Sequence, residues 1–142
     1  MEVPQLAGRD GKKSESEAKV YFEKELSVSL AEREIWVDVG SERIPHKVDL
    51  ATEDLSILIE CKSYTFTASG KEPSHKLEQA KADALLLALS SAKRKILIFD
   101  DDEHPRKGSL ARLFERRNRS VLGRVEVWRH WQGTFEKVTS RP

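Results

Sequence analysis

Hydrophobic and polar positions recur along the chain with two different periods, which predicts a mixture of helices and strands. Apolar residues return about every 3.6 positions between residues 14 and 30, the spacing of a helix with one buried face. We expect Ser14 or Ser16 to cap this helix, because a serine oxygen can accept a hydrogen bond from a free amide of the first turn. A second helical pattern covers residues 74–90, with Ser74 as its expected cap, and a third covers residues 109–117.

Alternating or wholly apolar runs predict the strands. These runs are residues 34–39, a hairpin of 46–51 and 55–64, a short strand at 95–99, and a final hairpin of 125–131 and 134–138 turned at Gln132 and Gly133. A strand, a helix and another strand in succession favour a crossover connection, so the sheet should be mixed. The expected fold class is α/β, a mixed central sheet flanked by helices, with residues 1–13 as a flexible N-terminal arm and 14–142 as a single domain.

The central hairpin is expected to bring charged residues together at one end of a buried strand. Side chains alternate along a strand, so Leu58, Glu60 and Lys62 share one face. A turn at residues 54–55 puts Asp49 directly opposite Glu60, whereas a turn at residues 53–54 puts the two diagonal to each other. Either register leaves the carboxylates within roughly 5 to 8 Å of each other.

Two neighbouring carboxylates repel each other, and a cation would relieve that repulsion. Mg²⁺ suits the position because it prefers oxygen ligands, here Asp49, Glu60 and the backbone carbonyl of Cys61, with Mn²⁺ as a substitute. Lys62 would aim its ammonium at a phosphate or at the attacking water, since the nearby carboxylates oppose the neutral form that a general base requires. The competing interpretation is that Asp49, Glu60 and Lys62 form only a salt-bridge cluster at a sheet edge.

Asp49, followed after ten residues by Glu60-Cys61-Lys62 at the end of an apolar strand, resembles the motif of the PD-(D/E)XK nuclease superfamily, also called restriction-endonuclease-like. The literal proline is missing, since Pro45 lies four residues before Asp49. The resemblance implies a core of helix, three-stranded meander, helix and strand, followed here by a C-terminal helix plus hairpin. It also implies an acidic residue from the first helix at the metal site, for which Glu17 is the expected match and Glu15 the alternative.

The activity that the resemblance implies is hydrolysis of DNA phosphodiester bonds by a Mg²⁺-dependent endonuclease. Its catalytic residues would be Asp49, Glu60, Lys62 and Glu17, and its metal would be held by Glu17, Asp49, Glu60 and Cys61. The alternative is a catalytically inactive nuclease-fold module that binds nucleic acid or another protein. Cleavage of both strands would require a homodimer or a partner protein, because one site makes one cut.

Charge is distributed unevenly along the chain, with a net −6 over residues 1–60 and +7 over residues 61–142. A basic second half would attract a polyanion, so DNA is the expected partner, and RNA stays open. Residues expected to contact nucleic acid are Ser63, Lys76, Gln79, Arg112 and Arg116. Gln79 resembles a helix glutamine of some branches of the superfamily, although position 83 is Asp where the RecB-like branch has tyrosine.

The remaining features narrow the class of protein. A single cysteine excludes a disulfide framework, and the lack of a long apolar run or secretory signal predicts a cytoplasmic protein without a membrane span. The long polar loop at residues 65–75 is expected to face the substrate. The acidic run at residues 100–104 resembles a metal cluster but is expected to cap the helix that follows it or to lie in solvent. His46 and His75 are the histidines that could approach the site.

Overall fold

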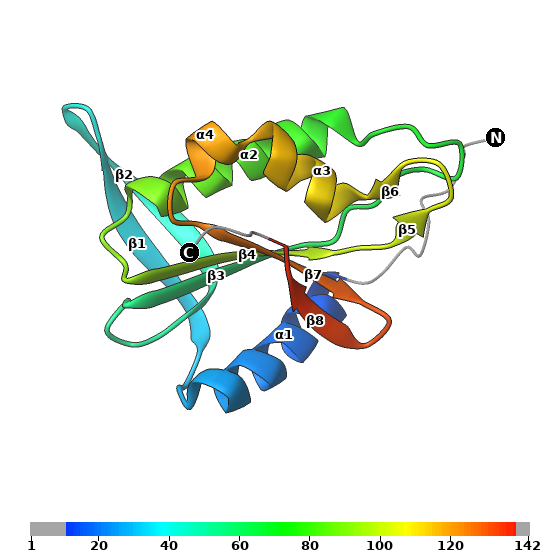
Figure 1. The fold of residues 1–142 in the computed structure, drawn as a ribbon. Helices are drawn as coiled ribbons and strands as arrows, with labels where there is room; N and C mark the ends of the chain where they lie inside the picture. Colours follow the sequence, from blue (N-terminus) through cyan, green and yellow to red (C-terminus); the bar gives the residue numbers. More distant parts are fainter. Residues whose placement is uncertain (1–10, 139–142) are drawn as a thin grey trace.

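The protein is a mixed α/β fold built around one six-stranded sheet, as a computed structural model that describes residues 11–138 shows (Figure 1). The sheet has the order β1-β2-β3-β4-β7-β8, and a small sheet pairs β5 with β6. The elements are α1 Gly11–Leu26, β1 Ala31–Val39, β2 Glu42–Ala51, β3 Ile57–Lys62, α2 Ser74–Leu89, β4 Arg94–Asp100, β5 Glu103–His104, β6 Gly108–Ser109, α3 Leu110–Arg117, α4 Arg119–Leu122, β7 Glu126–Trp131 and β8 Thr134–Lys137.

Strand directions confirm the expected mixed sheet. β1, β2 and β3 form an antiparallel meander, β3 pairs with β4 and β4 with β7 in parallel, and β8 returns antiparallel to β7. The central strands β3 and β4 are buried on both faces, which explains why their sequences are nearly continuous apolar runs. The final hairpin, turned at Gln132 and Gly133, is also confirmed.

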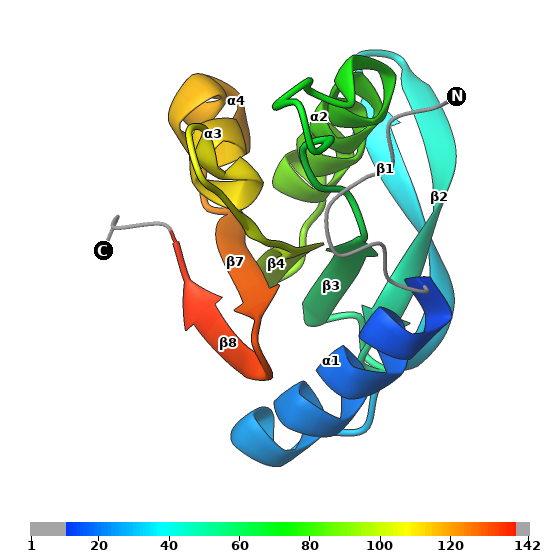
Figure 2. The ribbon, with the colours of Figure 1, turned by 90° about the vertical axis from the view of Figure 1, so that its right-hand side faces the viewer.

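Helices cover both faces of the sheet. Figures 1 and 2 show α2, α3 and α4 on one face and α1 on the other. Leu58 and Phe99 pack in the core on the α2 side, while Phe22, Ile59 and Ile98 pack in the core on the α1 side. Neighbouring residues of β3 therefore face opposite layers, as the period of two requires.

The register of β2 against β3 agrees with the first of the two expected registers. Leu50 pairs with Ile59 and Ala51 with Leu58, so the next position outward sets Asp49 against Glu60. The turn is stabilised by Asp54, whose side chain accepts hydrogen bonds from Thr52 and Ser56, and Leu55 takes a positive φ of 60°. β2 also has an irregularity opposite β1 close to Asp49, where the pairing shifts between Ala31 and Arg33.

α1 begins and ends earlier than its sequence pattern predicts. It starts at Gly11, so residues 11–13 of the expected arm are helical, and residues 1–10 lie outside the described part. Ser14 is not a cap, because it lies inside the helix and its hydroxyl donates to the Asp100 carboxylate on β4. The helix ends at Leu26, since Ser27 adopts a left-handed φ of 52°, and Leu30 continues the apolar pattern from outside the helix.

The starts of α2 and α3 show which of the expected caps the structure contains. α2 begins at Ser74, but its N-cap is Pro73 and no side chain caps it, so the expected Ser74 cap is wrong. Ser109 caps α3 by accepting a hydrogen bond from the Arg112 amide. Asp101 accepts hydrogen bonds from the Ser109 hydroxyl and the first amides of α3, which confirms that the acidic run serves the next helix.

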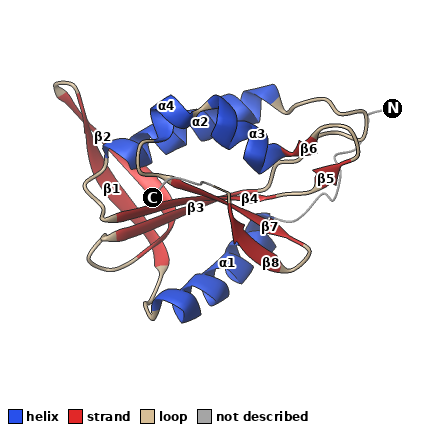
Figure 3. Cartoon of the chain, viewed as in Figure 1, coloured by secondary structure: helices blue, strands red, loops and turns tan. Residues whose placement is uncertain are grey.

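The loop between β3 and α2, residues 63–73, is held by the β5–β6 hairpin. His104 Nε2 lies 3.1 Å from the Ala68 carbonyl oxygen, and Arg106 donates to the Ser69 carbonyl at 3.2 Å. Both segments lie at the same end of the molecule, where Figure 3 shows the tan loop between β3 and α2 near the short red strands β5 and β6. None of the helices within residues 11–138 has the length and apolar character needed to cross a lipid bilayer.

Candidate metal centre

Glu60 lies near the end of β3 and is the most deeply buried carboxylate of the expected site. Only 4% of its side chain is exposed, and its Oε2 lies 3.1 Å from Nε2 of His46 on β2. Burial raises the pKa of Glu60, although the bond to His46 and the charge of Lys62 oppose the rise. The same hydrogen bond raises the pKa of His46 and outweighs the opposite effect of burial.

Lys62 follows on the same face of β3 and pairs with Asp83 of α2. Its Nζ lies 2.5 Å from Asp83 Oδ2, and the two side chains are 10% and 21% exposed. Burial opposes the charged ammonium, but the bond to Asp83 and the attraction of Glu60 outweigh it and raise the pKa of Lys62. The lysine is therefore held as a cation, which fits the electrostatic role and not that of a general base.

His46, Glu60 and Asp83 come close enough to share one ion. One ligand atom from each lies within 4.8 Å of the other two. An imidazole nitrogen and two carboxylate oxygens are donors that a divalent cation accepts, so this set fits a metal. The three residues come from β2, β3 and α2, and the crossover that carries α2 over the sheet brings the third to the first two.

Asp49 lies beside this cluster but forms a hydrogen bond with the backbone instead. Its Oδ2 accepts a hydrogen bond from the Cys61 backbone amide at 2.8 Å, so it ties β2 to β3 just beyond their last paired residues. Burial raises the pKa of Asp49, whereas the Cys61 amide and the charge of Lys62 lower it. Among the described residues the group that could share one ion contains Asp83 and not Asp49. The salt bridge of Lys62 is likewise to Asp83 and not to Asp49.

The two candidate acids of α1 face different surroundings. Glu17 reaches His130 of β7, with Oε2 at 3.2 Å from Nε2, and the other ring nitrogen of His130 lies 3.4 Å from Asp100 Oδ1. Glu15 instead acts on Cys61, where it adds to the effects of burial and of Asp49 in raising the pKa of the thiol. The structure therefore pairs Glu17 with His130 and does not bring it to Glu60, whereas the charge of Glu15 acts on the Cys61 thiol of β3.

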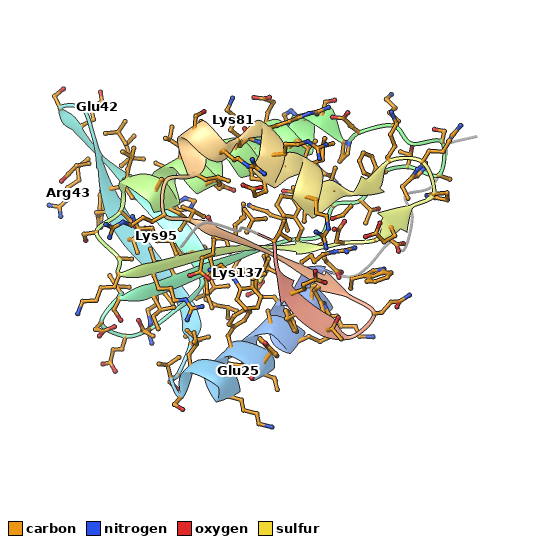
Figure 4. All side chains as sticks on the ribbon, in the orientation of Figure 1. Glu25, Glu42, Arg43, Lys81, Lys95 and Lys137 are labelled. Atoms are coloured by element: carbon orange, nitrogen blue, oxygen red, sulfur yellow. The ribbon has the colours of Figure 1, made fainter. Side chains whose placement is uncertain are left out.

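The residues expected to contact nucleic acid fall into two groups, one at the end of β3 and on α2, the other on α3. Ser63 follows Lys62 directly, and Lys76 lies over the Tyr64 ring at 5.4 Å, so both belong to the end of β3 and the start of α2. Gln79 is exposed on α2, whose Lys81 points outward from the helical layer in Figure 4.

The two arginines of α3 lie elsewhere. Arg112 pairs with Glu136 of β8 at 2.8 Å, and Arg116 is exposed. The structure therefore groups Ser63 and Lys76 with the candidate centre and leaves both arginines on a separate helix.

Asp83 is the residue of this centre that sequence reasoning missed. It stands four positions after Gln79, one turn along the same helix, and its only signal was the missing tyrosine at that position. His46 was expected as a residue that could approach the site, and it does so, while His75 is exposed in the first turn of α2. No family model matches the chain, and no curated protein or solved structure matches it.

Proposed function

We propose that the protein is a metal-dependent nuclease that hydrolyses phosphodiester bonds of DNA, acting as an endonuclease of the PD-(D/E)XK superfamily. The observation that carries the proposal is the joint position of Glu60 and Lys62 on one face at the end of a buried strand, next to a donor set that fits a cation. The element order of helix, three-stranded antiparallel meander, helix and parallel strand supports the family assignment.

The residues of the centre have different proposed roles, according to their charge. Glu60 and Asp83, with His46, would hold the metal, and a bound divalent ion supplies a water of lowered pKa and neutralises charge on the phosphate. Lys62 keeps its proton and is positioned to stabilise the negative charge that develops at the phosphate. Asp49 orients the end of β3 through the Cys61 amide and remains available to an ion that shifts toward it.

DNA binding in this proposal relies on the basic residues of the second half of the chain. Lys76 lies at the N-terminal turn of α2, where free backbone amides also attract phosphate. The loop at residues 63–73 stands beside the end of β3 and would border the bound strand. Each copy has one centre, so cutting both strands would require a second copy or a partner protein.

A cleavage assay tests the proposal directly. Purified protein is incubated with supercoiled plasmid, linear duplex, single-stranded DNA and RNA, each with Mg²⁺, Mn²⁺ or EDTA. We expect nicking that requires a metal and falls by about 100-fold or more in Glu60→Gln and Lys62→Ala. Lys24→Ala, which removes an exposed lysine of α1, is the matched control and should cleave at the wild-type rate.

A catalytically inactive binding module is the second candidate. It is favoured by the way the centre is paired within the protein, since Glu60 bonds His46 and Lys62 bonds Asp83. Salt-sensitive DNA binding with no metal-dependent cleavage of any substrate would support the module and refute the nuclease.

A further inference from the structure

His104 lies on the short strand β5, and its hydrogen bonds define the protonation state of its ring. The backbone amides of Arg106 and Lys107 both donate to Nδ1, at 3.1 Å each. Nε2 lies 3.1 Å from the carbonyl oxygen of Ala68, which can only accept. Nδ1 is therefore without a proton and Nε2 carries the hydrogen, so the imidazole that fits these partners is the neutral one.

The ring is packed against the loop of residues 63–73, whose outer part forms a compact turn. The Gly70 amide donates to the Thr67 carbonyl at 2.9 Å. Gly70 has a φ of 89°, and a Cβ at its position would lie 3.2 Å from Cε1 of His104. Phe66 is 2% exposed, and its ring lies 5.8 Å from the imidazole. The turn therefore approaches His104 closely on a surface that leaves no room for a side chain at Gly70.

We infer that His104 is a positioning residue: its neutral ring holds the loop of residues 63–73 beside the candidate metal centre, and protonation of the ring releases the loop. The loop connects the end of β3, which carries Lys62, to α2, which carries Asp83. The inference rests on the proposed function only in the statement that this loop borders DNA.

Protonation acts through the position of the ring. A hydrogen on Nδ1 would point at the amide hydrogens of Arg106 and Lys107, so donors would face donors. The side chain of His104 is buried, so the ring has to turn away from these amides. The bond from Nε2 to Ala68 is lost with that turn, although Nε2 keeps its hydrogen in both forms.

The charged groups of the two segments favour the neutral ring. Each acid of the loop, of β5 and of the residues that lead into β5 has another partner: Asp101 and Glu103 pair with Arg129, Asp102 accepts from the Glu103 amide, and Glu72 pairs with Arg117. The cations of the same segments are Lys71, Arg106 and Lys107. A proton on His104 would add a positive charge beside these cations.

Hydrogen exchange of the loop amides, measured by mass spectrometry with EDTA present, follows loop release without reference to DNA. Dividing each rate by the intrinsic rate at the same pH removes the ordinary pH dependence of exchange. Histidines change charge between about pH 5 and pH 8. We expect the corrected rate of residues 63–73 to be about 10- to 100-fold higher at the acid end, the effect of losing about two hydrogen bonds. The amides of β4 should stay protected throughout.

Two variants separate protonation from packing. His104→Gln keeps a donor and an acceptor but does not titrate, so the corrected rate of its loop should be the same at both ends of the pH range. Gly70→Ala leaves His104 in place and sets a methyl group against its ring, so its loop should exchange fast already at the alkaline end. His75→Gln, at an exposed histidine of α2, is the matched control and should behave as the wild type. Circular dichroism establishes that each variant is folded.

A wild-type rate that does not change with pH, or that changes equally in His104→Gln, overturns the inference. Nitrogen-15 spectra of the histidine rings that place the hydrogen on Nδ1 of His104 at the alkaline end overturn it as well. In the cleavage assay Gly70→Ala should raise KM for plasmid by about 10-fold and change kcat by less than about 2-fold, because the loop borders the DNA and holds no metal. An unchanged KM overturns the positioning role. The expected exchange without any cleavage would refute only the nuclease, and cleavage with a loop that is insensitive to pH would refute only the inference.

Discussion

The ion pair of Lys62 and Asp83 can be tested by a double-mutant cycle with Lys62→Met and Asp83→Asn, two substitutions that remove charge and largely keep side-chain size. Losing one partner of a fully buried pair costs about 3–5 kcal/mol, and an exposed pair is worth about 0–1 kcal/mol. The two side chains are 10% and 21% exposed, which places this pair between those limits. We therefore expect each single variant to lose about 2 kcal/mol of unfolding free energy.

The double variant should lose far less than the two single variants combined. Once both charges are gone no unpaired buried charge remains, so the coupling energy should be about 1.5–2 kcal/mol. Unfolding in urea with EDTA present keeps metal ions out of the measurement. With a slope of about 2 kcal/mol per molar urea, each single variant should shift the midpoint by about 1 M.

The matched control is the exposed pair of Arg112 and Glu136, whose side chains are both about half exposed. The cycle of Arg112→Met and Glu136→Gln should show a coupling below about 0.5–1 kcal/mol. If the effects at Lys62 and Asp83 add within about 0.5 kcal/mol, the pair is not formed as described and the geometry of the candidate centre is wrong.

Three further expectations concern stability. Asp101→Ala removes the acceptor of the first amides of α3 and one partner of the buried Arg129. We expect a loss of about 3–5 kcal/mol in chemical denaturation, and a loss under 1 kcal/mol contradicts that role. The bidentate bond from Arg94, together with that from Trp128, outweighs burial and lowers the folded pKa of Glu126 below 4.5. The stabilisation by the Glu126 carboxylate is present above pH 4.5 and is lost as the pH falls through the folded pKa. Glu126→Gln should therefore lower the free energy of unfolding by about 1 kcal/mol at pH 7 and by less in acid. A loss of unfolding free energy that does not depend on pH refutes this. Phe22→Ala should lower the free energy of unfolding by about 3–5 kcal/mol, because Phe22 is 1% exposed and packs against Trp128 and Phe135. The control Val20→Ala, at a residue that is 70% exposed, should change it by no more than about 0.5 kcal/mol. Equal melting temperatures of the two variants would contradict the packing of α1.

Much of the fold was predictable because local rules determine it. The period of two in β3 identifies which residues face α2, and the polar turn at residues 52–56 selects the register that sets Asp49 against Glu60. The end of α1 was not predictable from periodicity, since Leu30 continues the apolar pattern after the chain has left the helix at Ser27.

The composition of the candidate centre was only partly predictable. Glu15 and Glu17 differ by two positions, about 200° around a helix, so choosing between them requires the rotation of α1 against the sheet. Asp83 joins the centre because of how far α2 reaches back across β2 and β3, a distance set by tertiary packing and not by any spacing in the sequence. Glu60 and Lys62 were found because both lie on one strand.

The contacts of Ser14 and Glu17 with the sheet have a consequence for the opposite side of α1. Ser14 donates a hydrogen bond to Asp100, and Glu17 pairs with His130, so a rotation of α1 about its axis would break both contacts. Glu15 lies between these two residues in sequence, and its negative charge contributes to raising the pKa of Cys61. The rotation of α1, and with it the position of Glu15, therefore depends in part on a histidine of β7, two strands away from β3.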